Sequence, residues 1–257
     1  MDTRIESIAR HLWEARVARR HYENLPDTLT PASIADAYVA QRAYWRLAES
    51  VYGPVAGVKV ATTTQVMQRL MGIDHPCGGA IFAKTIHASP ARIAKADFVN
   101  LRLESEIALR LGTDMPADRA PWTADTAAGC VATAMAAYEL IEDRHAVYTE
   151  TKATSMIVDN CWNAGVVLGP EKAVTPGEIV GVKGRQSLNG VAAAEGRAED
   201  PYATLAWLAN LMAERGLGLT AGMVVITGSI VPTFSIAAGD RAVFAVEGFG
   251  EVCLDIV

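Results

Sequence analysis

The most constraining feature of this sequence is a change of pattern near Gly78. From there on, short apolar runs follow one another, and polar or glycine-bearing turns separate them. Apolar runs of this length with period-two alternation predict β-strands rather than helices. Because the strands are many and the helices few, we expect a mixed or antiparallel β architecture with peripheral helices. The predicted strands are residues 78–86, 101–112, 136–144, 163–169, 178–190, 223–230 and 241–257, and the predicted helices among them are 123–136 and 200–216.

The first third of the chain has a different texture, with apolar residues at helical spacing. The predicted elements there are helices at residues 3–22, 29–53 and 63–72, and a short strand at 55–62. Thr30 is expected to cap the second helix, with Pro31 in its first turn. We therefore predict an α+β chain with an N-terminal helical region at residues 1–77 and a larger β domain at 78–257.

Composition and motifs exclude several functional classes. The chain has 257 residues, is 51% hydrophobic and carries a formal net charge of -6, so nucleic acid and anionic membrane are not expected as partners. Four cysteines are scattered without a C-x-x-C pair, which predicts free thiols in a reducing, cytoplasmic compartment. No apolar stretch is long enough to span a membrane. Neither a G-x-G-x-x-G nor a G-x-S-x-G motif is present, which argues against a dinucleotide fold and an α/β-hydrolase.

One predicted strand, "LRLESEIALRLG" from Leu101, places two carboxylates on the same face. With period two, Glu104 and Glu106 point the same way, together with Arg102 and Arg110. Two carboxylates so close repel each other unless water, arginines or a cation lies between them. From this stretch alone, a solvated strand face and a pair of ligands for a hard divalent cation both remain open.

Several segments, taken in order, resemble those of a known family. They are "GVK", "GIDHP", "LESEIALRLG", "YELIEDR", "DNCWNAGVVLG", "LAWLANLMAERGLGLTAGMVVITGS" and "AAGDRAVFAVEGFGEV". In this order they resemble the fumarylacetoacetate hydrolase superfamily over nearly the whole chain. Within it, the likeness is to the 2-hydroxypentadienoate (2-keto-4-pentenoate) hydratases and the 4-oxalocrotonate decarboxylases.

The resemblance implies a fold, a metal and a set of ligands. It implies a small helical N-terminal part, a mixed β-roll of the fumarylacetoacetate hydrolase C-terminal-domain type, and a bound Mg²⁺ or Mn²⁺. The positions that match the family's metal ligands are Glu104, Glu106 and Glu139. Other implied partners are a small carboxylic acid substrate and further copies of the same chain in a homo-oligomer.

Other positions match parts of the family's active site. Lys59, in "GVK", matches a lysine that faces the substrate, where it can hold a carboxylate or move a proton. The strand-end block Thr227, Gly228 and Ser229 is expected to cradle the substrate carboxylate. The substrate-binding positions implied with less specific motifs are Asp159, Asn160, His75 and Cys77. A turn-forming role for Asp159 and Asn160, and an exposed or hydrogen-bonded role for His75, remain open.

The sequence departs from the hydratase pattern where specificity is expected. Cys77 stands where hydratases have an acid, Gly78 replaces an aromatic residue, Ser155 replaces an acid and Trp162 replaces a small residue. The metal ligands and Lys59 are unaffected. We therefore predict a metal-dependent lyase on a small 2-hydroxy-dienoic or 2-oxo acid, a 2-keto-4-pentenoate-type hydratase acting through a metal-stabilised enolate. The alternatives are a 4-oxalocrotonate-type decarboxylase and a non-catalytic protein that binds a small acid.

Overall fold

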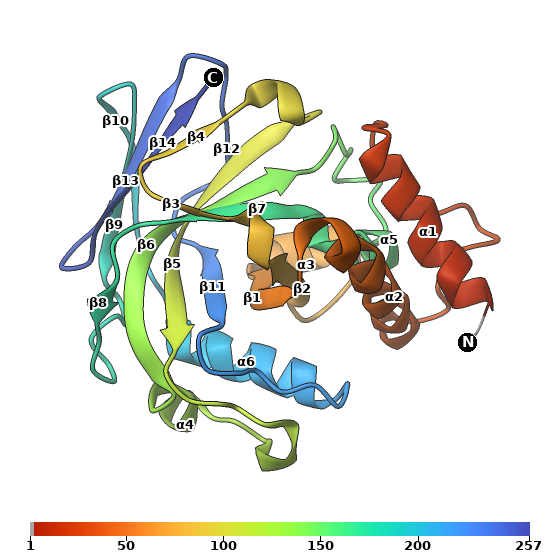
Figure 1. Cartoon of the computed structure of the whole chain (residues 1–257), viewed down its shortest axis with the longest axis horizontal. Helices are drawn as coiled ribbons and strands as arrows, with labels where there is room; N and C mark the ends of the chain where they lie inside the picture. Colours follow the sequence, from red (N-terminus) through yellow and green to blue (C-terminus); the bar gives the residue numbers. More distant parts are fainter. Residues whose placement is uncertain (1–2) are drawn as a thin grey trace.

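A computed structural model describes residues 3–257 and shows a strongly curved sheet flanked by helices and by a second, smaller sheet (Figure 1). The larger sheet has nine strands, in the order β2-β1-β11-β5-β6-β7-β3, with β12 paired to β5 and β8 to β6. Its strands are β1 (Val55–Ala61), β2 (Cys77–Phe82), β3 (Ile86–Ala88), β5 (Leu101–Leu111), β6 (Val131–Glu142), β7 (Asn163–Leu168), β8 (Lys172–Ala173), β11 (Val224–Ser229) and β12 (Phe234–Ser235).

The smaller sheet has five strands, in the order β10-β9-β13-β14-β4. These are β4 (Ala91–Ile93), β9 (Lys183–Leu188), β10 (Val191–Arg197), β13 (Arg241–Val246) and β14 (Gly250–Ile256). Most neighbouring strands are antiparallel, whereas β1 with β11, β3 with β7 and β4 with β14 are parallel. The mixed α and β architecture predicted from the sequence is therefore confirmed.

The helices lie at the periphery of the sheets, as the sequence predicts. They are α1 (Thr3–Val17), α2 (Ile34–Tyr52), α3 (Gln65–Met71), α4 (Ala124–Ala128), α5 (Ala153–Val158) and α6 (Pro201–Ala213). Figure 1 shows α1 and α2 on the side of the molecule opposite the smaller sheet. None of the helices in residues 3–257 combines the length and the apolar character needed to cross a membrane.

Local sequence signals account for several element ends. Asp200 caps α6 by accepting hydrogen bonds from the backbone N–H groups of Tyr202 and Ala203. The second helix begins later than predicted, because Ser33 rather than Thr30 is its N-cap and accepts from the backbone N–H of Asp36. Both residue types are good caps, so the sequence alone does not decide between them.

The predicted helix at residues 123–136 is largely wrong. Only Ala124–Ala128 is helical, and from Val131 the chain enters β6, which pairs with β5 along its length. The alanines of this segment favour a helix intrinsically, but pairing on both edges overrides that propensity. The strand β10 was also missed, because its largely exposed residues lack an apolar period.

Strand β1 links the N-terminal region to the larger sheet. It lies within the predicted helical region 1–77, yet it pairs with β2 and with β11. Gly57 allows the close approach to β11, since a Cβ there would lie 2.2 Å from the carbonyl oxygen of Val224. This pairing brings Lys59 into the sheet that carries the candidate metal ligands.

Candidate functional site

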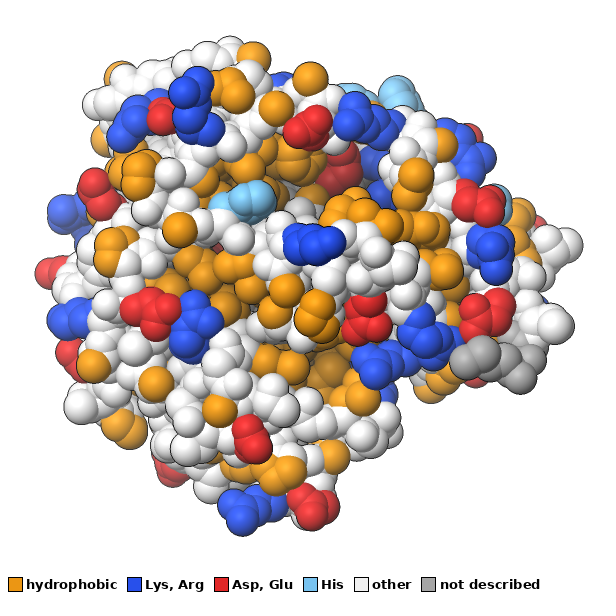
Figure 2. All heavy atoms as spheres, in the orientation of Figure 1, with side chains coloured by type: hydrophobic (Ala, Val, Ile, Leu, Met, Phe, Trp, Pro, Cys, Tyr) orange, Lys and Arg blue, Asp and Glu red, His pale blue; other side chains and the backbone are white. Residues whose placement is uncertain are grey.

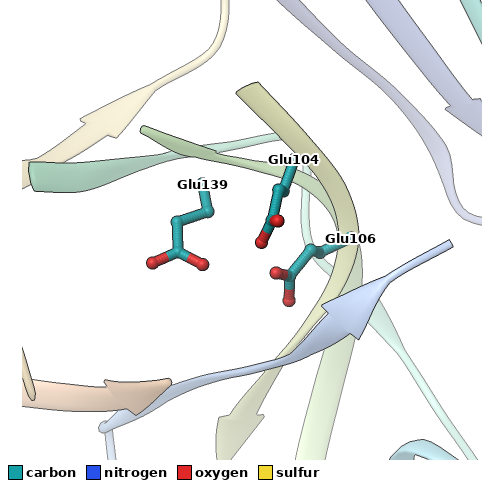
Figure 3. A group of neighbouring side chains, drawn as sticks. All are labelled: Glu104, Glu106 and Glu139. Atoms are coloured by element: carbon teal, nitrogen blue, oxygen red, sulfur yellow. The ribbon is translucent and has the colours of Figure 1, made fainter. Parts of the chain in front are cut away.

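Three carboxylates converge on the concave face of the larger sheet. Glu104 and Glu106 project from β5, and Glu139 projects from β6, where it lies directly opposite Glu104 in the strand register. One carboxylate oxygen from each residue lies within 4.8 Å of the other two, and all three side chains point into the same space (Figure 3). Glu104 and Glu106 therefore lie on the same face of β5, as period-two alternation predicts.

The electrostatics of this cluster favour a bound cation. Glu106 and Glu139 are fully buried, and Glu106 Oε1 and Glu139 Oε2 have no hydrogen-bond partner in the described part of the chain. Burial, together with the neighbouring glutamates, raises the pKa of Glu106 well above its usual range. Burial is also the main cause that raises the pKa of Glu139 to about 7. Unpartnered, mutually repelling oxygens are suited to a hard divalent metal ion, so this cluster could hold one.

Neighbouring groups hold each carboxylate through one oxygen. Glu106 Oε2 accepts a hydrogen bond of 2.7 Å from the backbone N–H of Gly228, and Glu139 Oε1 accepts one of 2.8 Å from Asn163 Nδ2. Glu104 Oε1 accepts from the hydroxyl of Thr233. Outer partners of this kind orient metal ligands.

Lys59 lies next to this cluster. Its side chain is 1% exposed, and its Nζ lies 3.0 Å from Glu139 Oε1 and 3.5 Å from the carbonyl oxygen of Cys161. Burial alone would lower the pKa of Lys59, but the Glu139 carboxylate and the other nearby negative groups raise it above its usual value. Lys59 is therefore an ammonium ion at neutral pH, which can donate a proton but not accept one.

The Thr227–Ser229 block also lies at this site, and its groups already have partners. The Thr227 hydroxyl donates to the carbonyl of Ile107, and the Ser229 hydroxyl donates to that of Val231. Gly228 has a φ of +104°, which favours glycine, and its N–H supports Glu106. In this arrangement the two hydroxyl hydrogens and the Gly228 N–H are engaged with the protein.

A cavity of about 410 Å³ opens beside the three carboxylates. Lys59, Glu104, Gly228 and Ser229 line it, and much of the remaining wall is apolar. The aromatic and apolar residues in its lining include Met67, Met71, Ile141, Tyr148, Met156 and Trp162. The face drawn in Figure 2 has hydrophobic side chains within its hollows and charges of both signs scattered around them.

Asp159 and Asn160 lie behind this cavity, in the turn that leads into β7. Asp159 forms a buried ion pair of 2.8 Å with Arg144. The side chain of Asn160 bonds the backbone N–H and carbonyl of Ala80 and also accepts from the indole N–H of Trp45. These contacts hold a turn whose residues 160–162 all have positive φ values of 48° to 61°. Asp159 and Asn160 therefore support the wall of the cavity.

Cys77 and His75 do not belong to the lining of this cavity, but they lie at different distances from it. Cys77 is fully buried in β2, and its thiol contacts Cys161 and Thr62, which both line the 410 Å³ cavity. His75 instead borders a larger cavity of about 780 Å³ between α2 and α6, which contains none of the three glutamates. The structure thus brings together Lys59, the glutamates and the Thr227–Ser229 block, places Cys77 directly behind the cavity wall, and places His75 at the other cavity.

Sequence reasoning missed several residues of the cavity wall. Tyr148, Met156 and Met71 come from a loop and from α5 and α3, and no motif singled them out. The sequence predicts a helix at residues 63–72, which contains α3, but none at α5, and neither segment carries a signal for the cavity that it faces. Thr233 and Asn163, which hold two of the glutamates, likewise had no local signal.

Known proteins resemble this chain over its whole length. A 2-keto-4-pentenoate hydratase from Paraburkholderia phymatum is 28% identical over 256 residues, covering 98% of this chain and 97% of the relative. A 2-hydroxyhexa-2,4-dienoate hydratase from Comamonas testosteroni is 26% identical over 254 residues, covering 96% of this chain and 95% of the relative.

Solved structures and a family model agree on the fold. A 4-oxalocrotonate decarboxylase from Pseudomonas putida, complexed with magnesium and adipate, superposes with a TM-score of 0.91 at 19% identity, covering 100% of this chain and 98% of that one. This confirms the predicted fold. The family model described as fumarylacetoacetate (FAA) hydrolase C-terminal matches residues 15–257. The chain therefore belongs to the fumarylacetoacetate hydrolase family.

Proposed function

We propose that this protein is a metal-dependent hydro-lyase that adds water to a small 2-hydroxy-dienoic acid of the 2-keto-4-pentenoate type. The observation that carries the proposal is the convergence of three carboxylates and Lys59, of which Glu104 and Lys59 line one cavity. Relatives that match the whole chain and are named as hydratases of such acids support it. The reaction is the addition of water across the conjugated alkene, giving a 4-hydroxy-2-oxo acid.

Glu104, Glu106 and Glu139 would hold the metal ion, for which Mg²⁺ or Mn²⁺ suits an all-oxygen ligand set. When bound, such an ion supplies Lewis-acid stabilisation of the negative charge that develops on a 2-oxo acid. The decarboxylase from P. putida was solved with magnesium, and a fumarylpyruvate hydrolase from P. aeruginosa was solved with Mn²⁺.

Lys59 is assigned the proton transfer. Its Nζ lies at the cavity wall, and its raised pKa keeps it protonated. It can therefore donate the proton that the dienol takes up at C5, and the neutral amine that results can accept the proton that the 2-hydroxyl loses as the 2-oxo form appears. The apolar wall around Trp162 and Met156 excludes bulk water from the diene.

A decarboxylase of the 4-oxalocrotonate type is the second candidate. It is favoured by Cys77, because the residue that replaces the hydratases' acid is a buried thiol that does not line the cavity. In that reaction the same proton donor would act after a C–CO₂ bond breaks rather than before water adds.

The test is a direct assay of both reactions. The purified protein is mixed with 2-hydroxypenta-2,4-dienoate, and loss of dienol absorbance is followed with Mg²⁺ and with EDTA. Release of CO₂ from 4-oxalocrotonate is measured in parallel. We expect Mg²⁺-dependent hydration. Release of CO₂ without hydration would replace this proposal by the decarboxylase, and metal binding without either reaction would indicate a binding protein.

A further inference from the structure

Arg102 lies on the cavity side of β5, at the end of the row that contains the candidate metal ligands. It has the same strand parity as Glu104 and lies opposite Ile141 on β6, and the register between these strands is regular here. Its neighbours Glu104, Ile141 and Thr233 all line the 410 Å³ cavity. Arg102 is not itself part of the cavity lining, but it lies next to residues that are.

The guanidinium of Arg102 is poorly satisfied by the protein. Its Nη2 makes one long hydrogen bond of 3.4 Å to the carbonyl of Thr233, and its Nε is buried without a partner. In residues 3–257, no carboxylate lies within ion-pair distance of it. By contrast, Lys59 pairs with Glu139 at 3.0 Å and Arg144 with Asp159 at 2.8 Å.

A carboxylate is the hydrogen-bond acceptor that best fits the unpaired Nε–H of Arg102. A half-buried guanidinium whose Nε–H lacks an acceptor is costly, and its planar fork matches a carboxylate in a bidentate geometry. The other candidates for holding a substrate carboxylate are already engaged, since Lys59 faces Glu139 and the Thr227 and Ser229 hydroxyls donate to backbone carbonyls.

We propose that Arg102 binds a carboxylate of the substrate. This inference rests on the proposed function, because it takes the substrate to be an acid that enters the cavity beside the three glutamates. The carboxylate is either the one next to the 2-oxo group or a second one at the far end of a diacid. Both present the same chemistry to Arg102, and the experiment below separates them.

The experiment measures binding of acids that the protein does not turn over. The probes are 2-oxopentanoate as a monoacid, adipate as a diacid, and 2-oxopentanamide as a neutral analogue, each titrated calorimetrically into Mg²⁺-loaded protein. Arg102→Gln removes the charge, and Arg102→Lys keeps it without the fork. Arg110→Gln is the matched control, because Arg110 lies on the same face of β5 but pairs with Glu171 at the other end. Thermal melts and a Mg²⁺ titration establish that each variant is folded and binds metal.

We expect Arg102→Gln to weaken acid binding about 10-fold or more. Arg102→Lys should restore part of the affinity, while Arg110→Gln and the amide probe should show no change. Weaker binding of both acids assigns Arg102 to the carboxylate beside the 2-oxo group, and weaker binding of adipate alone assigns it to a distal carboxylate. Unchanged acid binding, or an equal loss for the neutral amide, would overturn the proposal and leave Arg102 as a tether for Thr233.

The result is independent of the catalytic assay. If Arg102→Gln loses acid binding while the wild type turns over no dienoic acid, the hydro-lyase proposal fails and the assignment of Arg102 stands. If the wild type hydrates dienoates and Arg102→Gln binds both acids as tightly as the wild type, the hydro-lyase proposal stands and the assignment of Arg102 fails.

Discussion

The two faces of β5 and β6 bury polar groups in opposite ways. On the core face, the hydroxyls of Ser105 and Tyr138 both donate to Gln186 Oε1, at 2.9 and 2.7 Å. The Gln186 amide in turn donates to the carbonyl of Ser187, so the group is hydrogen-bonded throughout. On the cavity face of the same strands, Glu106 and Glu139 are equally buried, yet each keeps a carboxylate oxygen without a partner.

This difference separates polar groups that stabilise a fold from polar groups that serve a ligand. A fully satisfied buried network fixes the packing of two strands and contributes modestly to stability. Unsatisfied carboxylates that repel one another cost stability in the isolated protein, and that cost is offset only when a cation binds. The predictions below therefore expect changes on the cavity face to affect metal binding and turnover, and changes on the core face to affect unfolding.

The largest effect is expected for Glu106→Gln. This change keeps the volume of the side chain but removes one anionic ligand, so Mg²⁺ affinity should fall sharply and dienoate turnover should fall about 10³-fold or more. Calorimetric Mg²⁺ titration and the dienol assay measure the two effects, and circular dichroism checks the fold. Full activity of the variant at limiting Mg²⁺ would show that the metal assignment is wrong.

A smaller effect on turnover is expected for Lys59→Met. The variant keeps most of the aliphatic length and loses the proton donor, so the rate should fall about 10²-fold, as for a general acid. Because Lys59 is not one of the carboxylates, Mg²⁺ binding should persist. The check is a comparison of kcat with the Mg²⁺ dissociation constant. A wild-type rate would return Lys59 to a structural role as the ion-pair partner of Glu139.

Removal of the metal ion tests the cavity face by its effect on the thermal stability of the protein. A ligand present at about 100 times its Kd stabilises the folded state by about 2.7 kcal/mol, which for a chain of this size is roughly 5 to 10 °C in Tm. We expect EDTA to lower the Tm of the wild type by such an amount and to leave that of Glu106→Gln nearly unchanged. Equal responses of both proteins would place the stabilising metal site elsewhere.

The sequence predicts the positions of Glu104 and Glu106 better than it predicts that of Glu139. Period-two alternation was enough to place Glu104 and Glu106 on one face, because that relation is local. The role of Glu139 came only from the resemblance, since the pairing of β5 with β6 places it opposite Glu104, which is 35 positions earlier in the chain. The alanines of β6 even favoured a helix at residues 123–136, which is why the strand that carries Glu139 was predicted to begin too late.

The missing partner of Arg102 illustrates the same limit. The alternation placed Arg102 on the face of the two glutamates, and a flanking arginine that neutralises them was one of the open readings. Whether it pairs with them depends on side-chain geometry that no periodic pattern encodes. Only the folded chain shows that Arg102 contacts a carbonyl of the loop after β11 and no carboxylate in the described residues.

The smallest effect is expected on the core face, for Tyr138→Phe. Tyr138 is fully buried, and its hydroxyl makes a single hydrogen bond, to Gln186 Oε1. Removing that hydroxyl leaves Gln186 Oε1 with its second donor, Ser105, so no buried group loses its last partner. The free energy of unfolding should fall by about 1 kcal/mol, measured by denaturant titration. Mg²⁺ affinity and dienoate turnover should stay within about twofold of the wild type, because the ring still packs between the sheets. A large loss of metal affinity would show that the two faces are coupled through β6 and would end the distinction drawn here.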